Sequence, residues 1–162
     1  MKFKIYADGG CSGNKRGAGC PGAYAYIVLD SGNNVIYKSG ARVENTTNNR
    51  MELMGVIEGL KCLYGYTTNY TIKPECSVIT DSKYVVDNFN DYMTIWIKNG
   101  WRKSGGGIVI NSDLWKRLHE HSEVFLPFKI SWVKGHSSNL YNRSADELVR
   151  YYLYNERASE HE

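Results

Sequence analysis

The sequence predicts one α/β domain in which a mixed five-stranded sheet is flanked by helices. Three observations predict this fold. Segments in which apolar and polar residues alternate fill residues 3–41 and are joined by short turns, and two later strand-like segments are each reached through helical sequence. Stripes of apolar residues with helical spacing follow the third and fifth strands. Strands joined by short turns pair antiparallel, whereas strands reached through helices add in parallel by right-handed crossovers. We therefore expect three antiparallel strands followed by two parallel strands.

The first half of the chain supplies the antiparallel strands and the first helix. In the first strand, Phe3 to Asp8, apolar residues alternate with polar ones, so that Asp8 ends the strand on its polar face. The glycine-rich segment 9–22 is expected to be a turn, and strands follow at 23–29 and 35–41. A helix over residues 50–64 carries an apolar stripe, made of Leu53, Val56, Ile57, Leu60 and Tyr64.

The second half supplies the parallel strands. A short strand over 77–80 leads to a helix over 82–89, and a strand over 129–133 leads to a closing helix. Between them, residues 92–118 hold a short tryptophan-containing helix, the loop GWRKSGGGIVINSD and a helix containing LWKRLHEH. The stripe of the closing helix consists of Ala145, Leu148, Val149, Tyr152 and Leu153. One domain over 1–155 and a polar tail over 156–162 are expected.

Composition excludes several classes of protein. The formal net charge of +3 is too small to indicate nonspecific nucleic-acid binding, so any such surface must come from local clusters. The N-terminus lacks the apolar core of a signal peptide, and no apolar run has the roughly 18 residues of a membrane span. The four cysteines form no CxxC pair and no zinc-like spacing. These features predict a cytoplasmic protein with reduced thiols, and nothing indicates an obligate interface, so we expect a monomer.

Four acids stand near the ends of predicted elements. Asp8 ends the first strand, and Glu52 lies in the first turn of the first helix. Asp81 follows the fourth strand, and Asp146 lies near the start of the last helix. Each also suits a structural role: Asp8 a turn, Asp81 or the following serine an N-cap, and Asp146 the positive end of a helix dipole. Glu52 could form a capping box with Asn49 at the N-cap.

A shared site is the competing interpretation. If the first and fourth strands are neighbours, Asp8 and Asp81 leave adjacent strand ends together. Clustered carboxylates repel one another unless a hard cation lies among them. Mg²⁺ suits such a cluster because it accepts oxygen ligands, and a pair of ions ~4 Å apart can act on a phosphodiester.

Five stretches occur together in the order and spacing of a known family: YADGGCSGN (6–14), TTNNRMEL (46–53), TDSKYV (80–85), WVKGH (132–136) and ADEL (145–148). On these stretches, and over nearly its whole length, the chain resembles ribonuclease H type 1, a family of nucleases that cut RNA paired to DNA. The resemblance implies the ribonuclease H-like fold. The set is specific because five motifs match in order, although DG and DEL alone are common.

The resemblance also implies the chemistry. It implies an endonuclease that hydrolyses the RNA strand of an RNA–DNA hybrid by a two-metal-ion mechanism, leaving 5′-phosphate and 3′-hydroxyl ends. It implies two Mg²⁺ ions per site, with Mn²⁺ as a substitute, bound by Asp8, Glu52, Asp81 and Asp146. His136 matches the family's mobile histidine, which assists proton transfer or product release. Taken alone, His136 would be a surface loop histidine.

Residues that contact the hybrid are implied in the same way. Asn14, Asn48 and Asn49 match residues that reach the minor groove, and the backbone of Cys11, Ser12 and Gly13 matches contacts to RNA 2′-hydroxyls. These contacts suit the wide minor groove of A-like duplexes, which displays the 2′-OH.

The segment WIKNGWRKSGGG (96–107) matches the basic handle that grips the DNA strand, through Trp96, Lys98, Trp101, Arg102 and Lys103. Thr47 and Asn111 match a pocket for a DNA phosphate. Two departures predict a weaker grip: the stretch between Trp96 and Trp101 is about four residues short and lacks an aromatic, and Ser31 stands about where well-known members have an arginine of the phosphate pocket.

Two other functions remain open. One is a nuclease of the same fold that acts on DNA, against which the asparagine set and TTNNRMEL argue. The other is a noncatalytic hybrid-binding module, against which the retention of all four acids argues.

Overall fold

The computed structural model describes residues 1–13 and 19–155, and its helices and strands follow one another in nearly the predicted order. Their order is β1 (Lys2–Cys11), β2 (Cys20–Leu29), β3 (Val35–Thr46), α1 (Asn48–Thr67), β4 (Glu75–Thr80), α2 (Lys83–Asp91), α3 (Met93–Lys98), α4 (Ser112–Ser122), β5 (Phe128–Trp132) and α5 (Leu140–Tyr154). The predicted tail over 156–162 lies outside the described residues.

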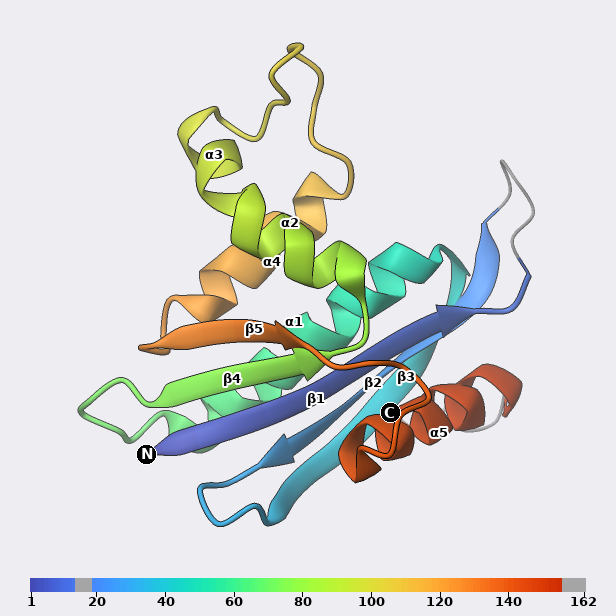
Figure 1. The fold of residues 1–162 in the computed structure, drawn as a ribbon, viewed down its shortest axis with the longest axis vertical. Helices are drawn as coiled ribbons and strands as arrows, with labels where there is room; N and C mark the ends of the chain where they lie inside the picture. The colour runs from blue at the N-terminus through green and yellow to red at the C-terminus, as the bar shows by residue number, and fades with distance from the viewer. Residues whose placement is uncertain (14–18, 156–162) are drawn as a thin grey trace.

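The sheet has the predicted topology, with strand order β3-β2-β1-β4-β5 (Figure 1). β2 pairs antiparallel with both β1 and β3, whereas β4 pairs parallel with β1 and β5. The last β1–β4 pair is Tyr6 with Ile79. Continuing that register by two residues sets Asp8 beside Asp81, so the central strand and its parallel neighbour deliver their acids to the same end of the sheet.

Both ends of the glycine-rich segment 9–22 are strand, so the predicted turn was drawn too long; residues 14–18 lie outside the described residues. β1 continues through Gly9 and Gly10 and still pairs Cys11 with Gly22, while β2 begins at Cys20. Glycines weaken a strand in isolation, but cross-strand hydrogen bonds and the helix packed against β1 hold the extended backbone here. β1 therefore continues three residues past Asp8.

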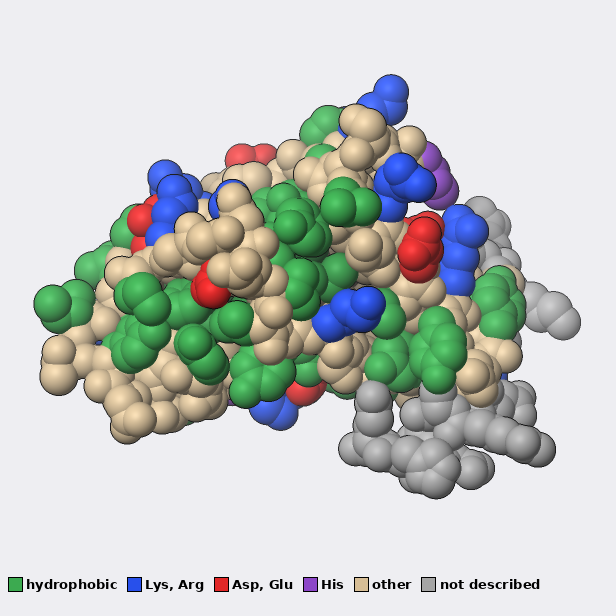
Figure 2. All heavy atoms as spheres, turned by 90° about the horizontal axis from the view of Figure 1, so that it is seen from below, with side chains coloured by type: hydrophobic (Ala, Val, Ile, Leu, Met, Phe, Trp, Pro, Cys, Tyr) green, Lys and Arg blue, Asp and Glu red, His purple; other side chains and the backbone are tan. Residues whose placement is uncertain are grey.

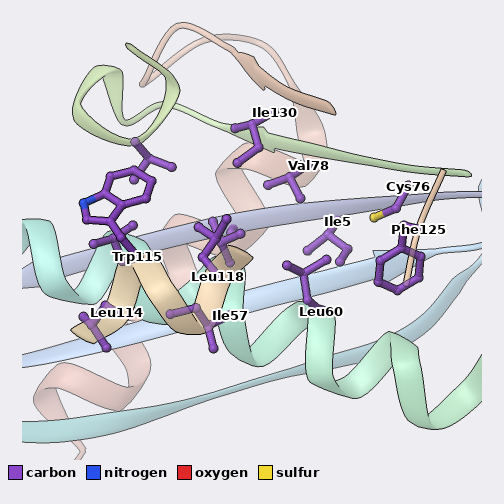
Figure 3. Close-up of a cluster of buried hydrophobic side chains, with 14 of the residues drawn as sticks. Ile5, Ile57, Leu60, Cys76, Val78, Leu114, Trp115, Leu118, Phe125 and Ile130 are labelled. Carbon is purple, nitrogen blue, oxygen red and sulfur yellow. The ribbon is translucent and has the colours of Figure 1, made fainter. Parts of the chain in front are cut away.

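The larger core lies between the sheet and α1, with α4 packed on α1 (Figure 3). Ile5, Val78 and Ile130 of the sheet meet Leu60 and its neighbours on α1, and Trp115 closes the cluster from α4. The stripe of α1 is buried as predicted except for Tyr64, which is 48% exposed while Leu63 is fully buried. This core fixes α1 rigidly against β1.

A second core covers the opposite face of the sheet, under α5 (Figure 1). Tyr6 packs with Ile27, Leu29 and Ala145 there. The face of β1 predicted to be polar is therefore buried at Tyr6 and at Asp8, which is only 4% exposed, whereas Lys4 is partly exposed. Within the described residues, no helix combines the length and hydrophobicity needed to cross a bilayer.

Candidate active site

Three carboxylates converge where β1, α1 and β4 meet. One oxygen each from Asp8, Glu52 and Asp81 lies within 4.8 Å of the others. Asp8 and Glu52 are 4% and 6% exposed, and Asp81 is half-buried. The strand register brings Asp8 and Asp81 together, and α1 adds Glu52 from the side.

The start of α1 explains how Glu52 reaches the cluster. Thr47 is the N-cap, with its Oγ1 accepting from the backbone N–H of Arg50 at 3.3 Å. Glu52 is therefore beyond the first turn, and the capping box with Asn49 is wrong. A Cβ on Gly9 would lie 2.3 Å from the carbonyl carbon of Met51 and 2.4 Å from the nitrogen of Glu52. Only a glycine lets the α1 backbone approach β1 this closely.

The electrostatics of the cluster oppose full ionisation. Burial, followed by the charge of Asp81, raises the pKa of Asp8 to about 8. Burial also raises the pKa of Glu52 well above its ordinary value, with the charges of Asp8 and Asp81 adding to it. Burial raises the pKa of Asp81, while hydrogen bonds from Asp8 and Asn142 work in the opposite direction. The group thus holds more acids than it can ionise without a counter-charge.

A divalent cation fits this arrangement. Oxygen Oε2 of Glu52 is buried and has no hydrogen-bond partner within the described part of the chain. Closely spaced carboxylate oxygens are the hard ligands that Mg²⁺ and similar ions prefer. An orphaned buried oxygen beside two further carboxylates therefore marks a place where a cation would satisfy an otherwise costly group.

Asp146 and His136 lie at the margin of the cluster. Asp146 stands in the second turn of α5, so a first-turn helix-dipole role is wrong; its Oδ2 pairs with Arg150 at 3.2 Å. Its charge contributes to the raised pKa of Asp8, Glu52 and Asp81, which places it nearby although outside the tight group of three. His136 is exposed in the loop before α5, and its charge lowers the pKa of Asp81.

The residues expected to contact the minor groove gather beside the cluster. Cys11 ends β1 and is followed by Ser12 and Gly13, and Asn48 and Asn49 are exposed at the start of α1. Thr47, expected in the phosphate pocket, is exposed beside them as the N-cap. A Cβ on Gly10 would lie 4.0 Å from Oδ1 of Asn48, so the two segments are neighbours. Asn14 lies outside the described residues.

The predicted handle is formed by α3 and the loop that follows it, which project from the rest of the fold (Figure 1). Lys98, Arg102 and Lys103 are exposed there. The two tryptophans are partly buried: Trp96 stacks on Tyr92 at 6.0 Å and meets Trp115 edge-on at 5.5 Å, while Lys116 Nζ lies 6.0 Å from the ring centre of Trp101. The tryptophans thus anchor the handle and the basic residues face solvent.

Ser31 does not lie near the expected phosphate pocket, and that part of the sequence comparison was wrong. Cys20 pairs with Thr46 at one end of β2, whereas Leu29 pairs with Val35 at the other, about 30 Å away. Ser31 follows the far end and exchanges hydrogen bonds with the backbone of Lys2 at 2.9 and 3.1 Å. An arginine at position 31 would not reach Thr47 or Asn111.

Comparison with known proteins decides the family. The family model described as RNase H matches residues 1–153. The chain belongs to the RNase H family. Ribonuclease H of Caldanaerobacter subterraneus subsp. tengcongensis is 43% identical over 151 residues, which cover 90% of this chain and 87% of that protein. Ribonuclease H of Neorickettsia sennetsu is 36% identical over 153 residues, covering 92% and 91%.

Solved structures agree with this chain in fold. LC9-RNase H1, described as a type 1 RNase H with the type 2 active-site motif, superposes with a TM-score of 0.77 at 28% identity, over 94% of this chain and 72% of that one. LC11-RNase H1, solved in complex with an RNA/DNA hybrid, gives a TM-score of 0.68 at 20% identity, over 96% and 98%. At that identity the second likeness concerns the fold alone.

Sequence patterns missed two residues of this RNase H that the structure places at the site. Asn142 on α5 is 2% exposed, and its side chain works against the rise in the pKa of Asp81 that burial causes. Its signal was available: it stands three residues before Ala145 on the apolar stripe, where a polar residue is out of place. Arg50 joins the expected phosphate-pocket residues, since its Nη1 donates to Asn111 at 3.2 Å and its guanidinium pairs with Asp113 at 2.8 Å.

Proposed function

We propose that this RNase H hydrolyses the RNA strand of RNA–DNA hybrids at a metal site formed by Asp8, Glu52, Asp81 and Asp146, with residues 1–155 as the catalytic domain. The observation that supports the site is the convergence of three carboxylates, two of them buried and one of these with an unpartnered oxygen. Membership of the family supports the reaction and its substrate.

The proposed cofactor is Mg²⁺, two ions per site, with Mn²⁺ as a substitute. Bound there, the ions would supply an activated water and stabilise the leaving 3′-oxygen, giving 5′-phosphate and 3′-hydroxyl ends. Asp8, Glu52 and Asp81 would supply the closely spaced ligand oxygens, and Asp146 would contribute its charge from the margin. His136, exposed beside Asp81, would accept or relay a proton at its imidazole or ease product release.

The surface beside the cluster is proposed to select the hybrid. The exposed Asn48 and Asn49, together with the backbone of Cys11 to Gly13, would meet 2′-hydroxyls and base edges in the minor groove. Lys98, Arg102 and Lys103 would contact phosphates of the DNA strand. LC11-RNase H1 binds an RNA/DNA hybrid on the same fold, which is consistent with this substrate.

We further propose that the protein acts as a monomer in the cytoplasm. All four cysteines are free thiols, as expected for a reducing compartment.

The test is cleavage of a labelled RNA–DNA hybrid in Mg²⁺, with duplex DNA and duplex RNA in parallel. We expect cutting of only the RNA of the hybrid, abolished by EDTA and reduced by at least about 10³-fold in Asp81→Asn. Folded wild-type protein that binds the hybrid without cutting it would indicate a noncatalytic module. Cutting of duplex DNA would indicate a DNA nuclease of the same fold.

A further inference from the structure

The chain leaves the sheet immediately before one of the carboxylates of the site. β4 ends at Thr80, which pairs with Trp132 of β5, and the N–H of Val133 donates to the carbonyl of Thr80 at 3.0 Å. Asp81 follows directly, beyond the paired part of β4. The position of its carboxylate therefore depends on contacts other than the pairing of strands.

Two side chains hold the peptide unit that follows Asp81. Its carbonyl oxygen accepts from Nε1 of Trp132 at 3.1 Å, and its N–H, which belongs to Ser82, donates to Oγ1 of Thr80 at 3.1 Å. The atoms of a peptide unit are coplanar, and Cα of Asp81 is one of them. Holding both polar groups of this unit therefore fixes the point from which the Asp81 side chain extends.

The indole ring of Trp132 is itself held in place. Although Trp132 is 45% exposed, the ammonium group of Lys83 lies 4.9 Å from the centre of its ring. A cation at this distance is attracted to the face of an indole. Lys83 is the first residue of α2, so the ring lies against the helix that begins just after Asp81. The indole N–H can only donate, so its role toward the carbonyl is unambiguous.

The segment that follows β5 also reaches the carboxylate. A Cβ on Gly135 would lie 3.1 Å from Oδ2 of Asp81, so the backbone at Gly135 lies beside the carboxylate. Trp132, three residues earlier, bonds to the backbone of the same aspartate. One short segment thus contacts Asp81 at its carbonyl and at its carboxylate, and this sets where both lie relative to β5.

We propose that Trp132 is a positioning residue for the metal site. Its indole N–H holds the peptide unit after Asp81, so that the carboxylate stays beside those of Asp8 and Glu52. This inference rests on the proposed function of the carboxylates as metal ligands. The competing interpretation is that the bond only fastens the end of β5 to the end of β4 and stabilises the fold.

The experiment measures Mg²⁺ affinity without catalysis, by calorimetry and by the Mg²⁺-dependent rise in melting temperature of the full chain. Trp132→Phe removes the N–H and keeps an aromatic ring for Lys83. Thr80→Val is nearly the same size as wild type and removes the acceptor at the other end of the peptide unit. Loss of a group that orients a metal ligand typically lowers metal affinity by ~10- to 100-fold, and we expect ~10-fold here because both groups act through the backbone.

Hybrid cleavage gives a second measurement on the same variants. At a fixed Mg²⁺ concentration that does not saturate the site, kcat of Trp132→Phe should fall while KM for the hybrid stays within about twofold. Raising the Mg²⁺ concentration should restore most of kcat, because the carboxylates themselves are still present.

Trp115→Phe is the matched control. It makes the same substitution and removes an indole N–H bond of similar length, to the hydroxyl of Tyr84 at 3.2 Å, which is not part of the carboxylate cluster. It should lower the melting temperature, because Trp115 is fully buried and a smaller ring leaves a cavity, but leave Mg²⁺ affinity unchanged. A Mg²⁺ affinity of Trp132→Phe equal to that of Trp115→Phe would overturn the positioning role. Absence of any Mg²⁺ response in wild type would instead refute the proposed metal site itself.

Discussion

At the scale of single residues, the raised pKa of Asp8 makes the stability of the metal-free protein depend on pH. In the unfolded chain its carboxyl group titrates near the ordinary pKa of 3.8, whereas burial and the charge of Asp81 raise the folded-state pKa to about 8. Between these values the metal-free folded protein binds more protons than the unfolded chain. The free energy of unfolding therefore falls as pH rises through this window.

Asp8→Asn should remove this pH dependence. In metal-free buffer we expect the variant to gain stability over wild type as pH rises from 5 to 8, by about 1–3 kcal/mol after allowance for relaxation of the site. Urea denaturation at several pH values checks this. A stability difference that does not change with pH would contradict the raised pKa. With Mg²⁺ present, wild type should be more stable than Asp8→Asn, because only wild type gains stability from binding the ion.

At the scale of elements, the contact between β1 and α1 decides where Glu52 lies. Gly9 allows the two backbones to touch, and the buried α1 stripe holds them there. Sequence periodicity predicted both elements, since period-two and helical patterns are local. It could not predict that β1 continues to Cys11, because glycine-rich sequence favours turns locally and only pairing with β2 and packing of α1 make it strand.

Gly9→Ala should disturb the site through this contact. The added methyl group cannot fit, so α1 must shift, at a cost of roughly 1–3 kcal/mol or more, and Mg²⁺ should bind more weakly because Glu52 moves. Gly65→Ala is the control, because Gly65 lies on α1 but a Cβ there would meet nothing within 4 Å. Alanine at this position should stabilise α1 by up to about 1 kcal/mol. Equal effects of the two substitutions on melting temperature and Mg²⁺ binding would refute the close contact.

At the scale of the whole molecule, the start of α1 beside the acid cluster is joined to the start of α4, which follows the handle in the chain. Arg50 of α1 makes this connection through Asn111 and Asp113. On the face seen from below, by contrast, lysines and arginines of the described residues are scattered among hydrophobic and polar side chains (Figure 2). The handle, where Lys98, Arg102 and Lys103 are exposed close together in the chain, is the surface proposed to grip the hybrid.

Removing the handle charges should weaken binding without altering the chemistry. We expect the Lys98→Ala/Lys103→Ala variant to raise KM for the hybrid, to leave kcat nearly unchanged, and to lower the salt dependence of binding by about one phosphate contact per lysine. Two controls should change neither KM nor the salt dependence of binding: Lys38→Ala, which removes an exposed lysine of β3, and Ser31→Arg. An effect of Ser31→Arg equal to that of the handle variant would contradict the surface assigned here.

The sequence was sufficient for the topology and for the acids, because strand order follows from connection lengths and the acids lie at element ends. It was insufficient to predict the partners of Asn142 and Arg50 or the location of Ser31. Arg50 bonds to Asn111, 61 residues away in sequence. Asn142 affects the pKa of Asp81, which is equally far from it in the chain. The place of Ser31 depends on the hairpin register. Such partners and distances are set by tertiary packing, which local patterns do not encode.

The most direct test of the central claim is to locate the metal. A crystal of the wild-type protein soaked in Mn²⁺ and measured at an anomalous wavelength should show ion density between the carboxylates of Asp8, Glu52 and Asp81, and none there in Asp81→Asn. Ordered Mn²⁺ elsewhere on wild-type protein, with none among these three carboxylates, would contradict the account.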